Sequence, residues 1–251
     1  MKKTLICALL ILVLSAAAWA DKIYYHCPLR GAVIVKSFYN SAAFSYRTKC
    51  PRCGHMGSSD HKVSGTNGAT TGTYVCPRCG STVSLFIRNE TLAPTVPEDC
   101  FEVFYHAVLQ GGVVTLQQPF APDFYYRYSC SHCGRLSDDE YYASSPGGLT
   151  EYKYDCPRCR RTSGIRILTY SRSLEGRDLS MVYSHCAVTG AIITEYDPFS
   201  AEYGYRELCR NCGALKTGTL RHSARSGEYK YSFVCSRCRK KQEVLIVSYT
   251  E

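Results

Sequence analysis

Apolar and polar residues alternate with a period of two in many short stretches of this 251-residue chain. A clear example is 228–234, and short runs rich in β-branched residues recur at 83–87, 165–170 and 244–249. Successive side chains of a β-strand point to opposite faces, so this period predicts half-buried strands. No long stretch carries apolar residues at helical spacing. We therefore predict a chain that is mostly β.

The strand pattern repeats three times, with a period of about eighty residues, which indicates tandem small units. Each copy opens with an aromatic strand that carries a histidine, at His26, His106 and His185. A glycine flanked by β-branched residues follows, which predicts a β-hairpin. The predicted units, called units 1, 2 and 3 below, span 21–90, 98–170 and 179–251. Short linkers are predicted at 89–99 and 171–178.

Four cysteines recur in every unit at one spacing. Two Cys-x-x-Cys knuckles are separated by 22 residues in each copy, although the intervening sequence differs widely. Two such knuckles can hold one ion between four sulfurs in a tetrahedral arrangement. The predicted ligands are Cys50, Cys53, Cys76 and Cys79 in unit 1, Cys130, Cys133, Cys156 and Cys159 in unit 2, and Cys209, Cys212, Cys235 and Cys238 in unit 3.

This pattern closely resembles that of the zinc-ribbon, or rubredoxin-like, family. The resemblance covers the last two thirds of each unit and rests on Cys-Pro-Arg-Cys-Gly, present twice in unit 1, and on Cys-x-x-Cys-Gly in the others. It implies three tandem metal-stabilised β-hairpin units of zinc-ribbon type, with one structural zinc each. The glycine permits a left-handed turn that directs backbone N–H groups at the sulfurs. Arg160 and Arg239 replace it at two knuckles, which leaves the turn shape there open.

Two alternatives to zinc remain. Iron in the same cage would make a one-electron carrier, as the likeness to rubredoxin also implies. Basic residues around the knuckles, and a gap between knuckles shorter than in rubredoxin, argue against iron. Disulfides across the knuckles are the other alternative, because exported thiols are normally oxidised.

Export is predicted from residues 1–20. Lys2 and Lys3 precede an apolar run that ends in Ala18-Trp19-Ala20, the pattern of a secretory signal peptide. The mature chain would begin near Asp21 and be periplasmic or secreted. No later stretch is long and apolar enough to span a bilayer as a helix.

Three cysteines of the predicted mature chain lie outside the quartets: Cys27, Cys100 and Cys186. Cys27 and Cys186 occupy matching positions, each directly after a recurrent histidine. Two alternatives stay open for this pair, a disulfide between the outer units or two buried thiols.

The recurrent histidines are predicted to be buried, with a ring nitrogen hydrogen-bonded within the sheet. An arginine also stands three residues before the first ligand cysteine of each unit, at Arg47, Arg127 and Arg206. These arginines are candidates for anion binding, and they equally suit stacking on tyrosines or offsetting thiolate charge.

The formal net charge of the chain is +9. The outer units are basic and unit 2 is slightly acidic, so a basic face could meet an anionic polymer or could simply be solvated. We find no phosphate loop, nucleophile elbow or open metal site, and therefore expect no enzyme. We expect a binding or scaffold module for a macromolecular partner, either a protein, a glycan or another anionic polymer, with nucleic acid less favoured because of export. The alternatives are an envelope electron carrier and a disulfide-stapled protein that binds an anionic polymer.

Overall fold

The computed structural model describes residues 22–92 and 102–251, which form β-strands and connecting turns. The prediction of a mostly β chain is thus confirmed. In these ranges there is no helix long and apolar enough to cross a membrane. The predicted signal peptide, Cys100 and most of the first linker lie outside the described residues.

The strands follow the same order in all three units. Unit 1 contains β1 (Ile23–Arg30), β2 (Ala32–Ser37), β3 (Ala43–Thr48), β4 (His61–Ser64), β5 (Gly68–Val75) and β6 (Thr82–Leu92). Unit 2 contains β7 (Glu102–Gln110), β8 (Gly112–Gln117), β9 (Asp123–Tyr128), β10 (Tyr141–Ser144), β11 (Gly148–Asp155) and β12 (Thr162–Ser173). Unit 3 contains β13 (Tyr183–Thr189), β14 (Ala191–Glu195), β15 (Glu202–Glu207), β16 (Leu220–Ser223), β17 (Gly227–Val234) and β18 (Lys241–Thr250).

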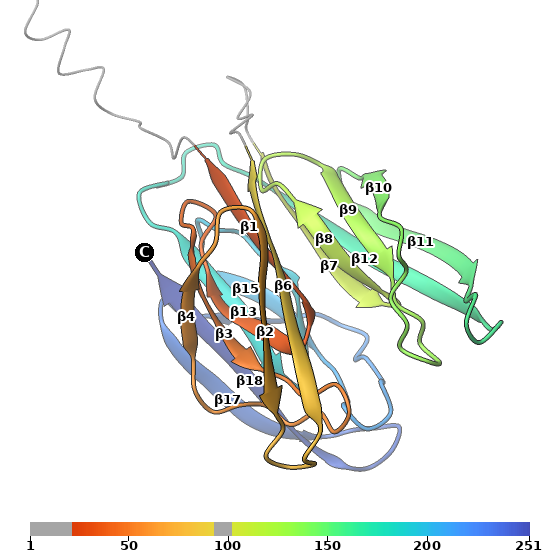
Figure 1. Cartoon of the computed structure of the whole chain (residues 1–251). Helices are drawn as coiled ribbons and strands as arrows, with labels where there is room; N and C mark the ends of the chain where they lie inside the picture. Colours follow the sequence, from red (N-terminus) through yellow and green to blue (C-terminus); the bar gives the residue numbers. More distant parts are fainter. Residues whose placement is uncertain (1–21, 93–101) are drawn as a thin grey trace, which may run out of the picture.

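Each unit folds into two three-stranded antiparallel sheets. In unit 1 their strand orders are β1-β6-β5 and β2-β3-β4, and the other units repeat both (Figure 1). The core of a unit lies between its two sheets. In unit 2, for example, Phe124 and Tyr126 of β9 pack against Ile165 and Ile167 of β12. The alternation seen in the sequence therefore places one face of each sheet in this core.

The glycine after the first strand does not form the predicted hairpin. β1 pairs with β6 and β2 pairs with β3, so the chain passes from one sheet to the other at Gly31. One residue is too few for the two-residue loop of a tight hairpin. Gly31, Gly111 and Gly190 have φ of 71°, 67° and 69°. A Cβ on any of them would lie 2.0–2.5 Å from a backbone oxygen of the unit's last strand, so only glycine fits this corner.

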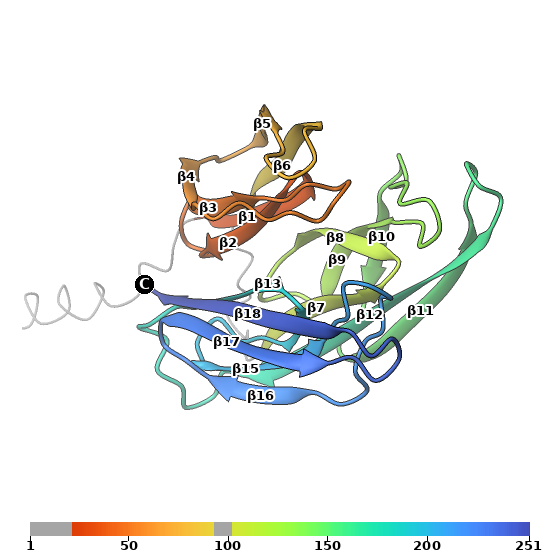
Figure 2. The same ribbon diagram turned by 90° about the horizontal axis from the view of Figure 1, so that it is seen from below.

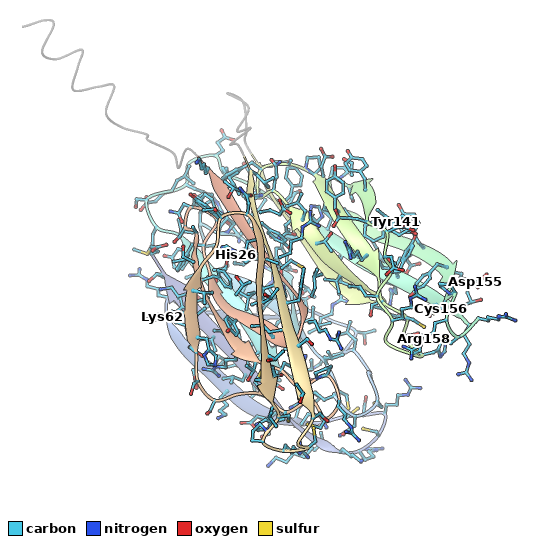
Figure 3. All side chains as sticks on the ribbon, in the orientation of Figure 1. His26, Lys62, Tyr141, Asp155, Cys156 and Arg158 are labelled. Atoms are coloured by element: carbon cyan, nitrogen blue, oxygen red, sulfur yellow. The ribbon has the colours of Figure 1, made fainter. Side chains whose placement is uncertain are left out.

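The recurrent histidines are buried and hydrogen-bonded, as predicted. Each ring accepts or donates a bond through Nδ1 to a side chain of the unit's last strand, at 2.9–3.0 Å. Each ring also contacts an aromatic ring of the third strand, with centroids 4.1–4.4 Å apart. Burial lowers the pKa of all three, to about 4 for His106 and His185. Figure 3 shows His26 in the interior of unit 1.

The three units close into a ring with approximate threefold symmetry. The first strand of each unit lies against the second strand of another: β1 against β8, β7 against β14, and β13 against β2. Figure 2 shows unit 1 (red to orange) above unit 3 (blue), with unit 2 (green) beside both. Units far apart in the sequence are therefore direct neighbours.

An apolar cluster occupies the centre of the ring. Besides Phe38, it contains an aromatic triangle of Tyr39, Phe120 and Phe199, one from each unit, with ring centroids 5.8, 5.8 and 6.3 Å apart. The first strands of units 1 and 2 add Ile23 and Val103, and Val182 lies directly before the first strand of unit 3. Leu174, from the segment predicted as the second linker, packs into the same cluster. The segment between units 2 and 3 thus contributes to the shared core.

The buried histidines should make the protein sensitive to acid. Their folded-state pKa lies below the unfolded value of about 6.5, so the unfolded chain binds more protons below that pH. The contribution of these histidines to the free energy of unfolding should be fully present above pH 6.5. It should fall as the pH drops towards 4, by up to about 3 kcal/mol each for His106 and His185. Urea unfolding of metal-loaded protein between pH 7.5 and 5 measures this slope.

A matched pair of variants isolates the effect of burial. His106→Gln should be less stable at pH 7.5 but show a shallower loss of stability with acid, whereas His61→Gln, at an exposed histidine, should keep the wild-type slope. Metal content is measured at each pH, because thiolate protonation also releases metal. An unchanged slope in His106→Gln would contradict this explanation.

Candidate metal centres

The knuckles lie where the two sheets of a unit meet at one end. In unit 1 the first knuckle connects β3 to β4 and the second connects β5 to β6, and these strand pairs belong to different sheets. Units 2 and 3 repeat this arrangement. In Figure 1 the loop between β11 and β12, which carries the second knuckle of unit 2, lies at the outer end of that unit, away from unit 1. An ion held by one quartet would therefore connect two sheets that no hydrogen-bonded strand ladder joins.

The twelve predicted ligand cysteines come together as three sets of four. Within each set the sulfurs all lie within 4.8 Å of one another. Two pairs of sulfurs across the knuckles of each quartet are 3.5–3.7 Å apart. A tetrahedral ion with metal–sulfur bonds of about 2.3 Å needs sulfurs about 3.8 Å apart, whereas a disulfide needs about 2.05 Å. The spacing thus fits a four-thiolate ion site, and all cysteines of the described residues are free thiols.

The knuckle backbone has one shape in all six copies. The residue after the second cysteine donates its N–H to the carbonyl of the first, at 2.8–2.9 Å. Gly54 and Gly80 both have φ of 68° there, and Arg160 and Arg239 adopt the same conformation at 55° and 61°. These two arginines are the only non-glycine residues with positive φ among those described. The open question about the turn is settled, since arginine takes the glycine conformation.

Nearby hydrogen-bond donors favour the ionised form of some sulfurs. Ser163 Oγ lies 3.5 Å from Cys130 Sγ, and this hydroxyl, with the N–H groups of Cys133 and His132, lowers the pKa of Cys130 to about 5. Cys79 Sγ lies 3.4 Å from Ser81 Oγ, and hydrogen bonding with the side chain and the backbone of Ser81 lowers the pKa of Cys79 to about 6. Thiolate is the form that binds metal, so Cys79 and Cys130 are among the sulfurs most ready to bind a cation, whereas burial and the neighbouring thiols raise the pKa of Cys53 and Cys159 to about 11.

Cys27 and Cys186 are free thiols at two different interfaces. Cys27 lies 3.4 Å from the carbonyl oxygen of Val114 in unit 2, and Cys186 bonds to the carbonyl of Ile34 in unit 1. Burial raises the pKa of both to about 12. This geometry does not contain the disulfide between the outer units, and of the two thiols Cys27 is buried and Cys186 is half-buried.

The three arginines that precede the knuckles have different surroundings. Arg47 forms an ion pair with Asp60 and approaches Glu228 of unit 3. Arg206 bonds weakly to Thr219, at 3.5 Å. Arg127 has no ion-pair partner in the described part of the chain, and its Nε is buried without an acceptor. Of the candidates for anion binding, Arg47 is already neutralised and Arg127 is not.

Several residues of these sites were not found from the sequence. The hydroxyls of Ser81 and Ser163 have no counterpart in the other units, so the repeat gave no reason to select them. The ion pair between Arg88 of unit 1 and Glu140 of unit 2 depends on how the units pack. Position-by-position comparison of the three copies would have shown that these residues differ, without showing what they contact.

Known proteins give no guide to this chain. No family model matches it, and neither a curated protein nor a solved structure shows significant similarity. The zinc-ribbon likeness therefore rests on the cysteine spacing and on the geometry described above.

The left-handed arginines lead to a stability prediction. A left-handed conformation costs a non-glycine residue about 1–2 kcal/mol, and the greater chain entropy of glycine offsets about half of that. Arg160→Gly and Arg239→Gly should therefore each raise the free energy of unfolding by roughly 0.5–1 kcal/mol. Arg158→Gly, in the same knuckle but without positive φ, should give no gain. Chemical denaturation of metal-loaded protein tests this, and a loss of stability in Arg160→Gly would contradict it.

Proposed function

We propose that this protein is an exported zinc-binding repeat protein, a rigid scaffold that presents a surface to a macromolecular partner. The observation that carries the proposal is the position of the three quartets, each of which spans the two sheets of its unit. Units of this size have thin cores, and a metal cross-link supplies stability that apolar burial alone does not. Four sulfur ligands fill the tetrahedral sphere and leave no open position for substrate, which is typical of structural zinc.

Zinc is the metal we propose for these sites. Divalent zinc binds a given set of ligands more tightly than divalent iron, and it has no redox chemistry to disturb a structural role. A four-thiolate zinc site carries two negative charges, and basic side chains in the knuckles, such as Arg52, Arg78, Arg158 and Arg237, offset them. Figure 3 shows Arg158 close to Cys156 at the outer end of unit 2.

A binding role is also the role that the remaining residues support best. Histidine is the usual acid–base catalyst, and the three recurrent histidines are enclosed in the sheets with neutral rings. Three copies of one module, held in a ring, offer several surfaces in fixed relative positions. The signal-like residues 1–20 support export, which would place the partner in the cell envelope or outside the cell.

Loss of one ligand should remove one ion and loosen one unit. Cys76→Ser should lower the zinc content from three ions per chain to two and reduce the free energy of unfolding by about 3 kcal/mol or more. Excess chelator should abolish the cooperative unfolding of the wild type. Cys27→Ser, which changes a cysteine outside the quartets, should keep three zinc ions. Elemental analysis and circular dichroism measure these outcomes.

Two results would contradict the zinc proposal. A red, reducible chromophore with iron in place of zinc would support an electron carrier, and oxidised quartets without metal would support the disulfide alternative. Export is tested separately by intact-mass measurement of protein isolated from a bacterial host that expresses the whole chain. The mature form should begin near Asp21, and an unprocessed chain retained in the cytosol would argue against export.

A further inference from the structure

Units 1 and 2 enclose an open groove. It has a volume of about 1080 Å³. Its floor consists of the corner between β1 and β2 and parts of β5 and β6, and its opposite wall comes from the first knuckle of unit 2. In Figure 1 the two units spread apart toward their knuckle ends. Because the three units are copies of one another, the other interfaces serve as internal comparisons for this groove.

The groove is lined by cations without acidic partners. Arg30, Lys49 and Arg127 line it, and no acidic residue does. None of the three forms an ion pair within the described residues. Arg52 and Arg78, in the knuckles of the adjacent quartet, can offset the charge of a zinc–thiolate site there. The counterparts of Arg30 in units 2 and 3 are Gln110 and Thr189, and those of Lys49 are Ser129 and Leu208. The positive charge of both residues is therefore specific to unit 1.

Arg127 lacks the partner that its counterpart has. In unit 1, Arg47 bonds to Asp60. The matching carboxylate in unit 2, Glu140, instead pairs with Arg88 of unit 1 and accepts a bond from Thr115. The Nε of Arg127 is left buried without an acceptor. The packing of units 1 and 2 thus leaves the charge of the Arg127 guanidinium unpaired in the lining of the groove, where a carboxylate from outside can pair with it.

The floor of the groove is also less polar than its counterpart in unit 2. Phe86 of β6 is 39% exposed and pairs with Thr71 of β5. In unit 2 the same two positions hold Arg166 and Glu151, which form an ion pair at 2.6 Å. Leu29 and Leu136 add further apolar surface to the groove. A solvent-facing ion pair in one copy is thus replaced in unit 1 by an exposed aromatic ring.

The matching interface between units 3 and 1 is closed by direct contacts. Met56, the counterpart of Leu136, packs against Val188 and Val247 of unit 3. Arg47, the counterpart of Arg127, approaches Glu228 of the edge strand β17, with 3.7 Å between Nη2 and Oε1. At the position of Glu228, unit 1 has Ala69. The closed interface therefore supplies a carboxylate that the open groove lacks, and it covers apolar surface that the groove leaves exposed.

We propose that the groove between units 1 and 2 binds an acidic, extended segment of a partner protein. Carboxylates of this segment would face Arg30, Lys49 and Arg127, and an apolar side chain would cover Phe86 and Leu136. The closed interface is itself made of protein carboxylate and apolar side chains, and the leucine and phenylalanine surface suits a peptide better than a sugar chain. This inference deepens the proposed function, on which it rests, by naming the partner's chemistry.

Selection from a displayed library of random peptides tests the proposal. The bait is the zinc-loaded full chain, and the selected sequences should be enriched in aspartate and glutamate next to leucine or phenylalanine. Synthetic versions should bind at least about tenfold more weakly to Arg127→Gln and to Phe86→Thr, and their affinity should fall with salt. Arg206→Gln changes the matching arginine of unit 3, outside the groove, and should leave affinity unchanged.

Zinc content and thermal unfolding are measured on the same samples. Loss of peptide binding by a variant that keeps its zinc and its fold concerns the groove alone, whereas absence of zinc from the wild type would contradict the proposed zinc scaffold. Because Phe86 is exposed, Phe86→Thr is expected to fold even if Arg127→Gln does not. Selected peptides without acidic enrichment, or equal affinity for wild type and Phe86→Thr, would overturn the proposal. The proposal would also be overturned if no peptide bound the groove and oligogalacturonate, an acidic sugar chain, bound there in a manner that depends on Arg127.

Discussion

The structure depends on one constraint, the meeting of four sulfurs at the end of each pair of sheets. No strand ladder joins the two sheets of a unit. In unit 1 the chain passes from one sheet to the other at the glycine corner between β1 and β2, and again in the connection between β4 and β5. The quartets connect the sheets at the knuckle end, where the apolar core becomes thin. A four-thiolate ion held there would join the two small sheets into one unit.

The ring supplies the second level of stabilisation. Each unit provides a first strand to one neighbour and a second strand to the other, and the aromatic triangle of Tyr39, Phe120 and Phe199 fills the centre. Because β13 of unit 3 also contacts β2 of unit 1, the ring is closed and each unit is packed against both of the others. The same closure makes the interfaces unequal, because side chains at the matching positions differ. Where Arg47 and Met56 close one interface, Arg127 and Leu136 line an open groove at another.

Much of the local structure could be predicted from the sequence. Alternation fixed the strands, the constant cysteine spacing fixed the quartets, and the recurrent histidines were buried as expected. The glycine corner was misread, because a hairpin and a change of sheet both use a left-handed glycine between two β-branched runs. What distinguishes them is the pairing of β1 with β6, a contact between residues about sixty positions apart.

The ring, the surroundings of Arg127 and the groove could not be predicted for a related reason. They depend on which unit meets which, and every unit carries the same pattern. The pairing of Glu140 with Arg88 follows from packing between units, and it changes the role of an arginine that looks identical in all three copies.

X-ray absorption at the zinc edge, combined with metal quantification, tests the central claim most directly. The material is full-length protein purified without chelators or added metal. We expect three zinc ions per chain, each with four sulfur neighbours at about 2.3 Å. Fewer sulfur neighbours per ion, iron in place of zinc, or quartets oxidised to disulfides would contradict the account that zinc joins the two sheets of every unit.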